Sequence, residues 1–241
     1  MRAETRHQLK QDRFTKTTID MAEKTAHWSA EHQGRVIVLG AIALLIAAGV
    51  VGTWYHFNQE DQKASIEMSR AVRTLDTPVR PPNMPPQPEN PSFASAGERA
   101  AAAHKQFQEI ADKYPYTKAA DFAHYFLGLT SVDMGDSAGA ERELKKVASY
   151  RNADLAALAK FALASIYRNS NRSPQAIEIY KQLAAKPTAT VSKATAQMEL
   201  AATYQANNQP LEAKVIYQQL QKENPGGEVS QLASAKLQEM K

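Results

Sequence analysis

The sequence predicts an all-α protein in which one transmembrane helix is followed by a solenoid of helical hairpins. Two observations lead to this prediction. Residues 36–55 form an uncharged apolar run that is long enough to cross a membrane. Beyond it, short sequence patterns recur at steps of 36 and 37 residues, and a fixed period of this size is typical of stacked repeats.

The apolar run, VIVLGAIALLIAAGVVGTWY, lies between Arg35 and His56. Its length of about twenty residues matches a hydrocarbon core of roughly 30 Å, and Trp54 and Tyr55 are typical interfacial residues. A cleaved signal peptide is the main alternative. Because 35 residues precede the run, and because it exceeds the roughly 7–15 apolar residues of a signal peptide, we expect an uncleaved anchor over 36–56.

Basic residues favour a cytoplasmic N-terminus. Residues 1–35 carry seven Lys and Arg, whereas the equal stretch 57–91 carries four, and cytoplasmic flanks are usually the more basic. Closer to the span, residues 16–35 and 57–76 carry three each. We therefore expect 1–35 to be a cytoplasmic tail, either solvated and partly helical or a loosely amphipathic helix at the membrane surface.

A repeat of two amphipathic helices runs through the remainder of the chain. Each first helix contains Leu followed by a small residue, and each second helix contains Ala followed four residues later by a bulky residue. The small residue predicts a close approach of the two helices. The Leu-small pairs are Leu127-Gly128, Leu163-Ala164 and Leu200-Ala201, and the second-helix pairs are Ala103/Phe107, Ala140/Leu144, Ala176/Tyr180 and Ala213/Tyr217.

Turn signals separate the two halves of each repeat. They are Gly135-Asp136-Ser137, then Asn171 to Pro174, then Asn207 to Pro210. Pro174 and Pro210 suit the first position of a helix. Pro115, Pro187 and Pro225 stop the second helices.

This pattern resembles the tetratricopeptide repeat, whose nominal length is about 34 residues. The first signature position, often Trp in that family, is instead His124, Lys160 and Gln197. The resemblance implies a tetratricopeptide-like repeat domain over 57–241, closed by a capping helix at 229–240. The layout of tail, span and repeats is similar to bacterial inner-membrane proteins related to the ancillary subunit of the Sec translocon, which implies an extracytoplasmic repeat domain anchored in the inner membrane.

The resemblance also implies where a ligand binds. Positions on the first helix of each repeat line the concave face of such a stack, and an apolar groove suits an extended or helical peptide. Packing against neighbouring helices is the alternative role for each of them. The implied residues are Phe122, Tyr125, Leu129, Leu158, Phe161, Ser165, Thr195, Met198 and Ala202.

Catalytic and cofactor-binding motifs are not found in the sequence. It has no cysteine, no H-E-x-x-H, no phosphate-binding glycine loop and no G-x-S-x-G. The 29 Lys and Arg are mixed with 25 Asp and Glu, whereas nucleic-acid binding requires clustered basic charge. We therefore expect no enzyme, no cofactor, no metal site and no nucleic-acid partner, and the sequence leaves the oligomeric state open.

These features predict a membrane-anchored scaffold or chaperone-like adaptor that binds other proteins or peptides beside the translocon. The alternative is a structural subunit of an envelope complex, for cell division or outer-membrane assembly.

The tract PVRPPNMPPQPENP at 78–91 has two interpretations. It is either a linker before the folded domain or an insertion, over 77–94, in the turn of the first repeat. Apolar residues at helical spacing over 62–75 and a capping box at Ser95 and Glu98 favour the insertion. The tract is then a polyproline II spacer, with recognition by a proline-binding partner as an alternative.

Overall fold

The computed structural model describes residues 33–240 apart from 86, 88, 90 and 224. The predicted cytoplasmic tail, 1–35, lies outside these residues except for its last three. The described residues fall into two compact units, one ending at Asn58 and the other beginning at Gln59.

The first unit is the N-terminal part of α2, a helix that runs from Gln33 to Asp76 without a break. Its side chains from residue 37 to residue 58 are all exposed, and Leu44 and Leu45 each expose 73% of their surface. Among the described residues, α2 is the one helix that is long and apolar enough to cross a membrane, judged by length and composition.

The second unit contains the rest of α2 and eight further helices. They are α3 (Ala96–Lys113), α4 (Lys118–Asp133), α5 (Ser137–Ala148), α6 (Ala153–Asn169), α7 (Ser173–Ala185), α8 (Lys193–Ala206), α9 (Pro210–Glu223) and α10 (Glu228–Glu239).

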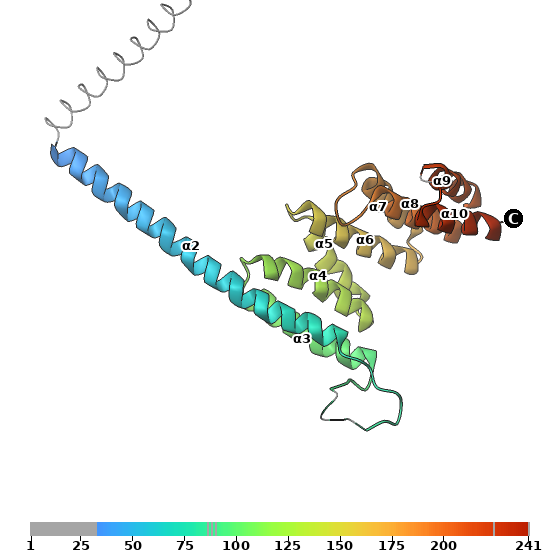
Figure 1. The fold of residues 1–241 in the computed structure, drawn as a ribbon, viewed down its shortest axis with the longest axis horizontal. Helices are drawn as coiled ribbons and strands as arrows, with labels where there is room; N and C mark the ends of the chain where they lie inside the picture. The colour runs from blue at the N-terminus through green and yellow to red at the C-terminus, as the bar shows by residue number, and fades with distance from the viewer. Residues whose placement is uncertain (1–32, 86, 88, 90, 224, 241) are drawn as a thin grey trace, which may run out of the picture. The chain divides into compact units, whose positions relative to one another are not determined.

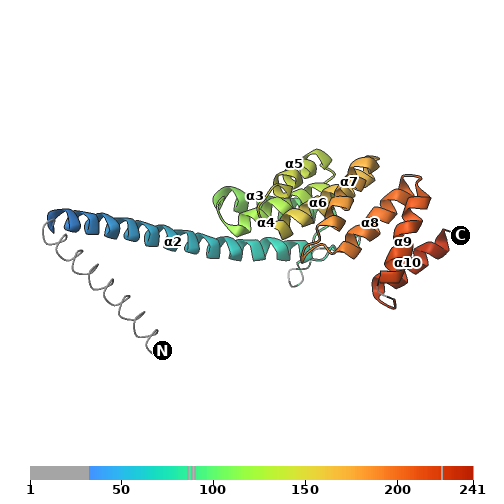
Figure 2. The same ribbon diagram turned by 90° about the horizontal axis from the view of Figure 1, so that it is seen from above.

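Helices α3 to α10 form a stack in which each helix packs on the next. Figures 1 and 2 show the hairpins α4/α5, α6/α7 and α8/α9 in succession, with α10 after the last. Contacts also join α4 to α6 and α8 to α10. The first helices of the hairpins therefore form one layer and the second helices another, as in a helical solenoid.

Each hairpin turn contains one residue with a positive φ. These residues are Gly135 at 79°, Asn171 at 57° and Asn208 at 58°, and Gly and Asn adopt this left-handed conformation at low cost. The N–H of the following residue donates to the carbonyl five positions earlier, at 2.8–2.9 Å. This is the Schellman hydrogen bond, so the Gly and Asn of the predicted turns end the first helices.

Side-chain caps start most of the helices. Ser95 begins α3 because its hydroxyl accepts from the Glu98 N–H at 3.0 Å. The Glu98 carboxylate accepts from the N–H of Ala94 at 2.8 Å, one residue before the usual capping-box partner. Thr117, Asp136 and Ser192 cap α4, α5 and α8 in the same way.

The C-terminal part of α2 packs against α3. Ala64 and Ala71 are fully buried in one core with Phe107 and Ile110. Glu67 also accepts hydrogen bonds from Lys113 and from the Tyr114 hydroxyl, each at 2.9 Å.

The proline-rich tract connects these two packed helices. Its base is closed by a bridge between Val79 and Phe93, in which the Arg80 N–H donates to Phe93 at 2.9 Å and the Phe93 N–H donates to Pro78 at 3.0 Å. The chain therefore leaves α2 and returns to α3 through a loop whose two ends are hydrogen-bonded to each other.

Within each hairpin a small residue faces a bulky one. A Cβ added at Gly128 would lie 2.6 Å from Cγ of Leu144, which is shorter than the contact distance between non-bonded carbon atoms. Ala164 and Tyr180 are fully buried in the central core, and Ala201 and Tyr217 are buried in the C-terminal core. The small residues thus make room for the bulky residues of the facing helix.

Glu141 on α5 joins this helix to the turn between α6 and α7. Its carboxylate accepts from Arg172 at 2.8 Å, from the Tyr167 hydroxyl at 3.0 Å and from Lys145 at 2.6 Å. The hydrogen bond from Arg172, followed by that from Lys145, lowers the pKa of Glu141 to about 2. Because the carboxylate is then charged at neutral pH, it holds neighbouring hairpins together.

The predicted fold class is confirmed, since the described residues are all-α, with nine helices and no strand. The predicted capping helix, 229–240, corresponds to α10 at Glu228–Glu239. The sequence predicted two separate helical segments, at 36–56 and 62–75. The structure joins both in the single helix α2.

Candidate peptide-binding face

The nine residues that the resemblance to the tetratricopeptide repeat implies as ligand-facing all lie on α4, α6 and α8. We call the surface formed by these nine residues the first-helix face. Its members fall into three equivalent rows of three, one residue per helix: Phe122, Leu158 and Thr195, then Tyr125, Phe161 and Met198, then Leu129, Ser165 and Ala202.

Every residue of the first-helix face is at least partly accessible to solvent. Phe122 exposes 39% of its surface, Thr195 is also exposed, and the other seven are half-buried. Exposed aromatic surface beside smaller apolar side chains is typical of sites that bind peptides. A ligand could therefore reach all three rows.

Four members of the face also support the fold. Tyr125, Leu158 and Phe161 pack against the central core, and Met198 packs against the C-terminal core. The Phe161 and Tyr180 rings meet edge to face with centroids 5.5 Å apart, and burial raises the pKa of Tyr125. Each of these four side chains packs on a core and also keeps part of its surface accessible to a ligand.

Three further residues extend the surface beyond the predicted rows. Arg168 on α6 forms an ion pair with Glu199 on α8, which ties two first helices together. Val132 lies three residues after Leu129 on α4 and is 44% exposed. Its helical spacing from Leu129 was a usable sequence signal, whereas the ion pair depends on which helices are neighbours.

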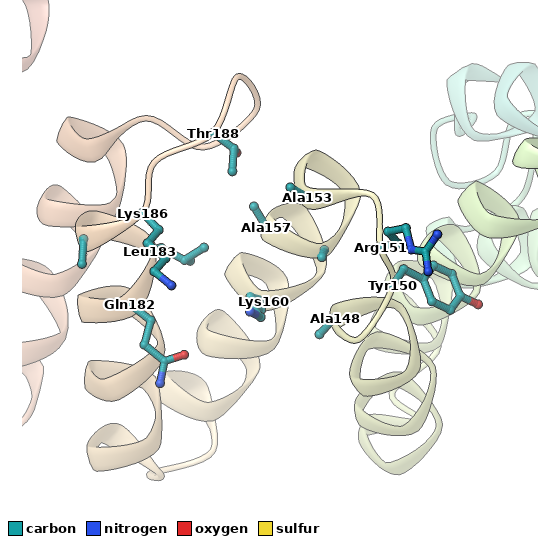
Figure 3. Close-up of a pocket in the computed structure, with 12 residues that line it drawn as sticks. Ala148, Tyr150, Arg151, Ala153, Ala157, Lys160, Gln182, Leu183, Lys186 and Thr188 are labelled. Atoms are coloured by element: carbon teal, nitrogen blue, oxygen red, sulfur yellow. The ribbon is translucent and has the colours of Figure 1, made fainter.

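The first-helix face is distinct from the cavity of about 480 Å³ shown in Figure 3. That cavity is lined by residues of α5, α6, α7 and their connections, and none of the nine residues takes part. In the part of the chain that the structure describes, no group of three or more His, Asp or Glu could hold a metal ion.

Comparison with known families gives the class of protein. Residues 26–241 match the model of the Tetratricopeptide repeat-like domain, and the chain belongs to this family. The predicted tetratricopeptide-like solenoid is therefore confirmed. Domains of this kind are in general protein-interaction modules rather than catalysts, so protein partners are the expected ligands.

Neither the curated proteins nor the solved structures contain a match to the chain.

Two phenylalanines of the first-helix face are predicted to contribute differently to the free energy of unfolding. Phe161→Ala should lower the free energy of unfolding by about 2–3 kcal/mol, because it removes packing on Tyr180. Phe122→Ala should cost less than about 1 kcal/mol, since its ring is not part of a buried cluster. Urea unfolding followed by circular dichroism measures both, and equal costs would contradict this assignment.

Proposed function

We propose that the protein is a membrane-anchored scaffold that binds other polypeptides through the first-helix face. The observation that supports this most is that nine positions in three equivalent rows, mainly apolar or small, are all accessible on one layer of the stack. Membership of a family of protein-interaction modules agrees with it. Binding is reversible capture of an extended or helical segment across α4, α6 and α8.

The anchor in this proposal is the apolar part of α2, residues 36–56, crossing the bacterial inner membrane once. The continuous exposure of residues 37–55 supports it, because lipid removes such a surface from water. The tail 1–35 is cytoplasmic and the repeat domain, 57–241, is extracytoplasmic. The tract 77–94 is an insertion between the paired helices of its first hairpin, and 229–240 caps the stack.

The finer role that we propose is a chaperone-like adaptor beside the protein translocon. Anchoring at the membrane raises the local concentration of the face near polypeptides that emerge there. The alternative role is a structural subunit of a cell-envelope complex, which would hold one fixed partner.

Site-specific photocrosslinking in intact cells tests the binding role. A photoreactive residue at Phe122 or Thr195, both exposed, should trap several polypeptides, whereas one at Gln218, exposed on α9 in the other layer, should trap few. A blank at both positions, or equal trapping at Gln218, would count against the face. A single stoichiometric product would favour the envelope-complex role instead.

Reporter fusions at the C-terminus test the anchor and its orientation. Alkaline phosphatase should be active and green fluorescent protein dark, because the repeat domain lies outside the cytoplasm. A matched variant without residues 36–56 should reverse both signals. The same reversal in the full chain would refute the proposed location.

A further inference from the structure

The cavity between α5 and α7 has an apolar floor and a basic rim. Its floor comes mainly from α6, with the buried residues Ala156 and Ala157, and from Leu183 of α7. In Figure 3 Lys160 stands on α6 and Lys186 directly follows the last residue of α7, both at the hollow, and Arg151 lies beside Tyr150 in the α5–α6 connection. The volume, about 480 Å³, is within the usual range for ligand pockets.

The positive charges of this cavity are not neutralised by the protein. Among the described residues, neither Arg151, Lys160 nor Lys186 forms an ion pair, and no acidic residue lines the cavity. The nearby carboxylate of Asp154 accepts a hydrogen bond from the Ala189 N–H at 3.0 Å. The cavity thus presents net positive charge above apolar surface.

In the equivalent groove between α3 and α5, polar side chains pair with one another. His124 replaces Lys160 there and lies 2.9 Å from both Glu143 and Lys146. Tyr150 stands at the position of Lys186 and is half-buried, and burial raises its pKa to about 12.

The equivalent groove between α7 and α9 is closed by an ion pair. Lys193 and Glu223 stand at the positions of Ala156 and Lys186, and they meet at 2.8 Å. Gln197 replaces Lys160 and is 8% exposed. The groove between α5 and α7 differs from this one because the small residue Ala156 stands where Lys193 would fill it. It differs from both because its cations, Lys160 and Lys186, have no acidic partner such as those of His124 and Lys193.

We propose that this cavity binds an acidic peptide segment of a partner protein. Carboxylates of aspartate or glutamate side chains pair with Lys160 and Lys186, and an adjoining apolar side chain rests on the alanine floor. The two cations come from different elements, Lys160 from α6 and Lys186 from the residue after α7, so each can pair with a separate carboxylate along an extended chain. The residues of this site are different from those of the first-helix face. The proposal therefore does not depend on ligand binding at that face.

Fluorescence anisotropy with the full chain in non-ionic detergent tests the proposal. The probe is a labelled pentapeptide with a central leucine and two glutamates on each side, acetylated and amidated at its ends. Saturable binding should weaken by at least about tenfold in Lys186→Glu, because an attraction becomes a repulsion. The matched control Lys222→Glu, exposed on α9, should change the affinity less than about twofold.

Two further measurements separate charge from shape. Ala185→Trp, at an exposed lining position, should likewise weaken binding without changing net charge. A peptide in which each glutamate is replaced by glutamine should not bind. Thermal unfolding of each variant checks that the stack remains folded.

The proposal is overturned if the parent chain shows no saturable binding or if both lysine variants lose affinity equally. It is also overturned if a leucine peptide with a free C-terminal carboxylate and no glutamate binds more tightly than the acidic probe.

Discussion

The close approach of the two helices in each hairpin is the constraint on which the rest of the structure depends. Gly128 leaves no room for a Cβ against Leu144, and Ala164 and Ala201 are fully buried in the cores that contain Tyr180 and Tyr217. A bulky residue packs only where its neighbour is small. Repeating this match every 36 or 37 residues fixes the spacing of the hairpins and divides their helices between two layers.

The two layers give the molecule two chemically different surfaces. The first-helix face has apolar and small side chains on α4, α6 and α8, several of which also pack inward. The grooves between second helices instead carry polar and charged residues. His124 and Glu223 each pair with a neighbouring side chain, whereas Lys186 forms no ion pair with a described residue. One repeat scaffold thus presents two kinds of surface, one for each contact that we propose, because side chains at equivalent positions differ from one repeat to the next.

Periodicity predicted the helices well because it records which residues are buried. The Leu-small pairs and the Gly and Asn of the turns have the structural roles that their residue types favour. The continuity of α2 was missed because hydropathy changes near residue 57, although the backbone remains helical.

The candidate sites were less predictable because they depend on neighbours from other repeats. The sequence assigned Phe122 and Phe161 to the same surface, but only the fold shows that Phe161 packs on Tyr180. Lys160 was visible as a departure from the signature Trp. Whether a hollow results depends on Ala156 and Lys186 beside it, and their contacts follow from packing rather than from spacing.

The central claim, that small residues set the helix approach, is tested most directly by a double-mutant cycle at Gly128 and Leu144. Urea unfolding should show Gly128→Ala destabilising the parent chain by about 1–3 kcal/mol through overpacking. In a Leu144→Ala background the same change should be neutral or stabilising by up to about 1 kcal/mol, since the clash is gone and alanine favours the helix. An equal effect of Gly128→Ala in both backgrounds would contradict the account.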